Sequence, residues 1–149
     1  MASASNFTPK ERIGQIHRPK LFSDIFSKNL VQPYHGNIEQ QTIHNTNYRD
    51  TLFTGQHSQV VIMSLKPHEA IGNEVHKVDQ FFRIEEGKAQ FILNNGKKKF
   101  VLGPGGAVVV PTGTWHNVIA LDKPVKLYTV YSPANHPPHT TQKVRPKND

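Results

Sequence analysis

The sequence predicts an all-β fold, a sandwich or barrel of short strands. Short segments with strand signals recur at even spacing between about residues 37 and 131. Glycine and proline turns separate these segments, and no helix-like period of apolar residues falls between them. Strands that follow one another without intervening helices pack as a sandwich or close into a barrel.

The chain before residue 37 is expected to be an extension. It holds apolar residues at the spacing of a short amphipathic helix, namely Leu21, Phe22, Ile25, Phe26 and Leu30. The apolar stripe of this helix would cover an open end of the barrel or a partner subunit. Further on, the polar, partly alternating segment Ile38–Asn45 predicts an edge strand, and Tyr48–Gly55 is interpreted as a connection.

The clearest strand signals begin at Gln59–Lys66, a β-rich run that Pro67 ends. The other strands are expected at Gln80–Glu85, Lys88–Leu93, Lys97–Leu102, Ala107–Val110, Trp115–Leu121 and Val125–Tyr131. Asn94-Asn95-Gly96 is a good hairpin turn, because Asn and Gly tolerate positive φ. After Pro133 the chain becomes proline-rich and polar, so little regular structure is expected there.

The length of 149 residues suits one domain with a sizeable core. We expect an N-terminal extension over 1–36, a barrel over 37–131 and an irregular tail over 132–149. The first fifteen residues lack the apolar core of a signal peptide, and no run approaches the roughly 20 apolar residues of a membrane span. A cytoplasmic protein that does not enter the membrane is therefore expected.

A net charge of +7 and a pI near 9.7 raise the question of nucleic-acid binding. The basic residues lie in the N-terminal segment, in the hairpin Lys97-Lys98-Lys99 and in the tail, without a known nucleic-acid motif. We interpret them as solvated charge, so nucleic acid is not an expected partner. Binding through the basic tails would show itself as an affinity that falls steeply with salt.

Two stretches carry residues that bind metals. In the first, Glu74 and His76 are two positions apart, where a strand would send both side chains to one face, and Gln80 follows after a turn. In the second, a Pro/Gly turn precedes His116, the first inward residue of a predicted strand. The chain has no cysteine, so a metal would be held by imidazole, carboxylate or amide groups, which favours Mn, Fe, Ni or Zn.

The spacing of these residues resembles the two motifs of the cupin superfamily. The second motif is present as Gly105, five residues, Pro111-Thr-Gly113, two residues and His116, with Ala120 where the family has Asn. The first motif is altered. Glu74 replaces its first His, His76 matches its second, and Gln80 replaces its Glu, six residues before Gly87.

The resemblance implies a double-stranded β-helix, or jelly-roll barrel, in which Glu74, His76, Gln80 and His116 bind one divalent transition metal. It also implies a homodimer. Each residue has an alternative role: Gln80 as a hydrogen-bond donor to bound water or substrate, Glu74 as a catalytic general base or a solvent-facing residue, and the histidines as ordinary surface or core residues.

For other residues, strand parity predicts whether the side chain points into the barrel or away from it. Phe82, Ile84 and Val118 should point inward, as core or as an apolar pocket wall, and Ile62 is also expected in the core. Asp79 should face the opposite side from Gln80 and serve a structural role. Histidines without a motif are interpreted as surface residues: His57, His68, His136 and His139.

The leading hypothesis is a small metal-dependent enzyme, a dioxygenase, isomerase or cyclase, acting on a compact organic substrate inside the barrel. The alternative is a non-catalytic module that binds or senses a small ligand in the same pocket. The altered first motif, and the lack of a further catalytic group evident in the sequence, support the alternative.

Overall fold

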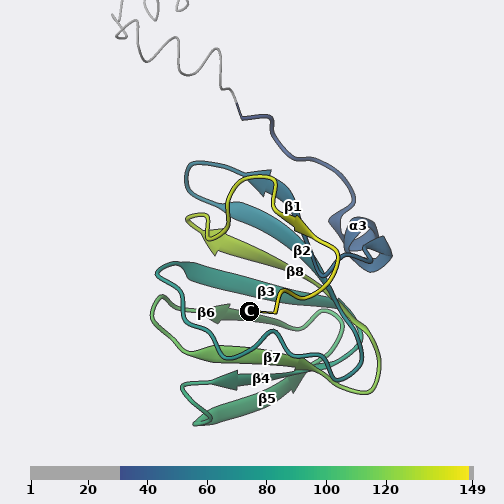
Figure 1. Ribbon diagram of the computed structural model, residues 1–149, viewed down its shortest axis with the longest axis vertical. Coiled ribbons are helices and arrows are strands. Elements are labelled where there is room, and N and C mark those ends of the chain that lie inside the picture. The colour runs from purple at the N-terminus through teal and green to yellow at the C-terminus, as the bar shows by residue number, and fades with distance from the viewer. Residues whose placement is uncertain (1–30, 148–149) are drawn as a thin grey trace, which may run out of the picture. The chain divides into compact units, whose positions relative to one another are not determined.

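The computed structural model describes residues 31–147 and consists mainly of antiparallel strands (Figure 1). Its elements are α3 (Ile38–His44), β1 (Arg49–Thr54), β2 (Gln59–Leu65), β3 (Asp79–Glu86), β4 (Ala89–Leu93), β5 (Lys98–Leu102), β6 (Ala107–Val110), β7 (His116–Ala120), β8 (Val125–Ser132) and β9 (Thr141–Gln142). Six strands form one sheet in the order β6-β3-β8-β2-β1-β9, and three form a second in the order β5-β4-β7. The all-β prediction is confirmed.

The core lies between the inner faces of these sheets. Strand β8 alternates buried and half-buried residues along its length and pairs with β2 on one side and β3 on the other. Phe82, Ile84 and Val118 are fully buried, as parity predicted, and each such side chain stabilises the fold by about 1.5–3 kcal/mol. Ile62 is buried as well, but on the opposite face of β2 from the core residue Val61.

Two predictions near the start of the domain were wrong. The segment expected as an edge strand is the helix α3, which packs against β8, β2 and β3. Its N-cap is Asn37, whose side chain accepts a hydrogen bond from the backbone N–H of Gln40 at 3.0 Å. The segment expected as a connection contains strand β1, which pairs with β2 from Arg49 opposite Met63 to Thr54 opposite Gln59.

The predicted turns are where the sequence placed them. Asn94, Asn95 and Gly96 all have positive φ, between 54° and 92°, and join β4 to β5. Gly87, between β3 and β4, has a φ of 81°, and a Cβ there would lie 2.2 Å from the carbonyl oxygen of Pro124. Only glycine fits this position without strain.

The C-terminal tail is irregular apart from β9, which pairs with the edge strand β1 and thereby joins the large sheet. The helix predicted around residues 21–30 lies outside the described residues. Within residues 31–147, no helix is long and apolar enough to cross a membrane. The domain boundaries and the cytoplasmic location stay predictions.

Candidate metal centre

Glu74 and His116 are brought together by the backbone. The N–H of each donates to the carbonyl oxygen of the other at 2.9 Å, which forms an isolated antiparallel bridge next to β7. Two residues opposite each other in such a pair point their side chains to the same face. The segment around Glu74 and His76 is not the regular strand that the sequence suggested, yet this bridge gives the shared face that a strand would have given.

His76 joins the pair from the same segment. Its backbone carbonyl accepts a hydrogen bond from the N–H of Gly113 at 2.9 Å, in the turn before His116. That turn is fixed in addition by Asp79, whose carboxylate accepts from the N–H and the hydroxyl of Thr112, both at 2.9 Å. Asp79 thus has the structural role that the sequence suggested.

The ligating atoms of Glu74, His76 and His116 all lie within 4.8 Å of one another. Glu74 Oε1 is 3.1 Å from His76 Nε2 and 3.5 Å from His116 Nε2. Two metal–ligand bonds of about 2.1 Å span about 3.0 Å at a right angle and about 3.4 Å at the tetrahedral angle. The two distances from Glu74 therefore fit two edges of a coordination polyhedron around one small divalent cation.

Hydrogen bonding supports the same interpretation. His116 Nδ1 lies 2.9 Å from the backbone oxygen of Thr114, and since a carbonyl only accepts, Nδ1 carries the proton. In the neutral ring, Nε2 then presents a lone pair toward Glu74. The Nε2 atoms of both His76 and His116 are buried, and within the described part of the chain they form no hydrogen bond of good geometry. A neutral His116 ring would repel the carboxylate, so these groups need positive charge between them, as a proton on the ring or as a metal ion.

The electrostatics of Glu74 follow from this arrangement. Burial raises the pKa of Glu74, but the attraction of the His116 and His76 rings outweighs burial and holds that pKa at about 2, below its ordinary 4.5. Glu74 is therefore a carboxylate at any physiological pH. With two imidazoles it makes a nitrogen and oxygen set with one negative charge, which suits Mn, Fe, Ni or Zn.

Gln80 lies at the start of β3, almost fully buried. Its Nε2 donates to the hydroxyl of Thr129 on β8 at 2.9 Å, and its Oε1 has no hydrogen-bond partner among the residues that the structure describes. A buried amide oxygen without a partner is unfavourable unless something else binds it. Gln80 thus retains an acceptor, and its assignment as the fourth ligand stays a prediction.

Sequence reasoning missed the ring system beside the three groups. Tyr131 on β8 lies edge-on to His76, with ring centroids 5.9 Å apart, and His136 in the tail contacts Tyr131 in turn. His136 is half-buried rather than a plain surface residue. Parity along β8 could have placed Tyr131 inward, but no sequence signal brings the tail back to the barrel.

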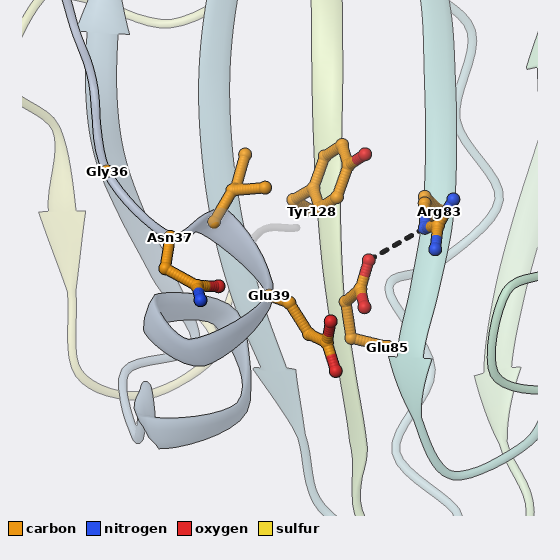
Figure 2. Close-up of a pocket in the computed structure, with 7 residues that line it drawn as sticks. Gly36, Asn37, Glu39, Arg83, Glu85 and Tyr128 are labelled. Atoms are coloured by element: carbon orange, nitrogen blue, oxygen red, sulfur yellow. Dashed lines mark hydrogen bonds and ion pairs between the residues drawn. The ribbon is translucent and has the colours of Figure 1, made fainter.

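A groove of about 590 Å³ lies elsewhere, beside α3 on the outer side of β3 and β8 (Figure 2). Figure 2 shows Arg83 and Glu85, two positions apart on β3, joined by a dashed line, and Arg83 Nε donates to Glu85 Oε1 at 2.7 Å. These two charges satisfy each other, and none of the three grouped side chains lines the groove. The chemistry is thus concentrated at Glu74, His76 and His116.

Comparison with known proteins agrees with this geometry. The family profile described as a cupin domain matches residues 61–131, which include all four predicted ligands. The chain is also 41% identical over 146 residues to the uncharacterised protein YrkC of Bacillus subtilis (strain 168), covering 88% of this chain and 77% of that protein. The chain belongs to the cupin family. A second relative, the uncharacterised protein L612 of Acanthamoeba polyphaga mimivirus, is 43% identical over 124 residues, or 80% of this chain and 78% of that one.

Solved structures share the fold. The crystal structure of BH2720 from Bacillus halodurans superposes with a TM-score of 0.75 at 38% identity, covering 76% of this chain and 91% of the other. A cupin from Methanocaldococcus jannaschii with a double-stranded β-helix fold matches with a TM-score of 0.54 at 14% identity, over 70% and 89% of the two chains. The two sheets are thus a cupin double-stranded β-helix. Because both curated relatives are uncharacterised, the comparisons give no specific activity.

Proposed function

We propose that this cupin is a metal-dependent enzyme, of the dioxygenase, isomerase or cyclase type, that acts on a small organic substrate held in the barrel. Its metal ligands are Glu74, His76 and His116, with Gln80 as the fourth. The observation that supports this proposal is the convergence of three ligating atoms within 4.8 Å, with two buried imidazole nitrogens that have no hydrogen bond within residues 31–147. A divalent cation bound there would act as a Lewis acid toward a substrate oxygen.

The low pKa of Glu74 favours a ligand over a general base. A general base works best when its pKa is near the working pH, and a carboxylate with a pKa of about 2 is a weak base. The variant Glu74→Gln separates the two roles. If Glu74 is a ligand, metal affinity falls in the variant, whereas a general base would leave metal binding intact and abolish turnover.

Buried aromatic rings pack against the inner side of the three groups. Phe82 packs edge-on against His116, with centroids 6.0 Å apart, and against Phe91 at 5.5 Å. Both phenylalanines are fully buried. An apolar, water-poor wall strengthens electrostatic interactions with a bound substrate.

The alternative is a cupin that binds or senses a small ligand without turning it over. The same residues would hold the metal in both cases, so metal binding alone does not separate the two functions. Oxygen uptake and product formation, measured with the metal-loaded protein over a panel of diketones, hydroxy acids and sugars, distinguish them. Turnover that disappears in His76→Ala supports the enzyme, and saturable binding without turnover supports the alternative.

A homodimer remains part of the proposal. Light scattering on the eluate of a size-exclusion column measures the mass in solution directly. A mass near twice the chain's 16.8 kDa supports the dimer, and a mass near 16.8 kDa contradicts it.

A further inference from the structure

The two imidazoles of the candidate metal centre are held in different ways. His116 is fixed by the hydrogen bond from its Nδ1 to Thr114. No such bond holds Nδ1 of His76 within residues 31–147. The His76 ring lies edge-on to His116, with centroids 5.3 Å apart, and to Tyr131 at 5.9 Å. Within the described residues, Tyr131 is the aromatic contact that His76 makes outside the three groups.

Tyr131 is in turn held by the tail. It is almost fully buried on β8, and its hydroxyl lies 3.2 Å from Nε2 of His136, five residues further along the chain. The two rings also meet edge-on, with centroids 5.2 Å apart. A ring contact and a hydrogen bond together restrict both the tilt and the position of the tyrosine.

The position of His136 is set by Gln59, a fully buried residue of β2 that lies opposite Tyr131 in the sheet. Gln59 Oε1 accepts from the N–H of Asn135 at 3.1 Å and of His136 at 3.0 Å, and Nε2 donates to the oxygen of His136 at 2.9 Å. The backbone groups fix the orientation of this amide. A buried amide is costly unless its bonds are made, so the tail is held specifically at this point.

We infer that His136 and Tyr131 are positioning residues that orient His76 for metal binding, and that the tail around residue 136 is part of the metal centre. This inference rests on the proposed metal site and adds to it how one ligand is held. We call the series of contacts from Gln59 through His136 and Tyr131 to His76 the path. It links the tail, which lies outside the predicted barrel, to the metal centre inside the barrel.

The test is a double-mutant cycle on the full chain with Co²⁺ as the probe. Metal-free protein is titrated calorimetrically, and the visible absorption of the bound cobalt reports its coordination. His136→Ala and Tyr131→Phe should each weaken Co²⁺ binding about tenfold, at the lower end of the range for groups that orient metal-binding histidines. Each should also change the cobalt spectrum. The double variant should bind no more weakly than either single one, because both changes break the same path.

A control and a third variant complete the experiment. His57→Ala removes an exposed histidine from the β1–β2 connection and should leave affinity and spectrum unchanged. Gln59→Leu removes the hydrogen bonds that hold the tail and leaves the rings of Tyr131 and His136 unaltered. It should weaken Co²⁺ binding as much as His136→Ala does. The inference can therefore still be tested if one of the variants does not fold.

Two results would overturn the inference. Wild-type affinity and spectrum in both single variants, or losses that add in the double variant, would show that the path does not orient His76 while leaving the proposed metal function standing. A wild-type protein that binds no Co²⁺ would remove the metal function and this inference together.

Discussion

Replacing Glu74 by glutamine should remove part of the protein's acid sensitivity. The pKa of Glu74 is about 2 in the folded protein and 4.5 ordinarily, so folding favours its ionised form. The stabilisation is fully present above about pH 4.5 and is lost as the pH falls through about 2. The pKa lies about 2.5 below its ordinary value, and at about 1.4 kcal/mol for each pH unit this gives about 3.5 kcal/mol as the upper limit of the stabilisation.

Urea denaturation of metal-free protein between pH 7 and pH 3 measures this loss. By pH 3 the wild-type free energy of unfolding should have fallen by about 2 kcal/mol more than that of Glu74→Gln. The matched control is Glu86→Gln, an exposed glutamate at the end of β3, whose pH dependence should follow that of the wild type within about 0.5 kcal/mol. Parallel curves for the wild type and Glu74→Gln would show that the imidazoles do not hold the carboxylate as described.

Three further predictions concern packing and the fourth ligand. In urea denaturation, Gly87→Ala should destabilise the protein by at least about 1 kcal/mol more than Gly96→Ala. Both glycines have positive φ, but only Gly87 faces a backbone oxygen, that of Pro124. Equal losses of stability in the two variants would contradict the close contact between Gly87 and Pro124. Phe82→Ala should lower the free energy of unfolding by about 3–5 kcal/mol, since the ring is fully buried, and a loss under 1 kcal/mol would refute that packing. Gln80→Leu should weaken metal binding in calorimetry by at least about tenfold, and unchanged affinity would exclude Gln80 as a ligand.

The sequence predicted the barrel well because its strands alternate. In β3 and β7, buried residues fall on every second position, and glycine or proline turns bound each run. Strand β1 has no such alternation, since all its residues after Arg49 are half-buried. The sheet partner of β1, rather than its own pattern, makes it a strand.

The helix α3 was missed although a signal was present. Asn37 is followed three residues later by Gln40, the pattern of a helix N-terminus, and the structure uses Asn37 as the cap. The short alternation of polar and apolar residues in Ile38–His44 resembled a strand. In so short a segment, period alone does not separate a helix from a strand.

The candidate site was predictable in part. The motif spacing identified Glu74, His76 and His116, because residues that meet across neighbouring segments of a barrel must keep a fixed distance from the turns. The contribution of His136 was not predictable. It depends on the buried amide of Gln59, which forms a hydrogen bond with His136, 77 residues further along the chain. The periodicity of apolar residues carries no information on a contact between a strand and an irregular segment.

Metal analysis of the untagged protein tests the central claim most directly. Elemental analysis of the wild type and of the single variants His76→Ala and His116→Ala, each loaded with metal and then desalted, measures metal bound per chain. We predict about one equivalent in the wild type and almost none in either variant, because each loses one of three ligands around a single cation. Full occupancy in both variants, or no metal in the wild type, would contradict a metal centre at these residues.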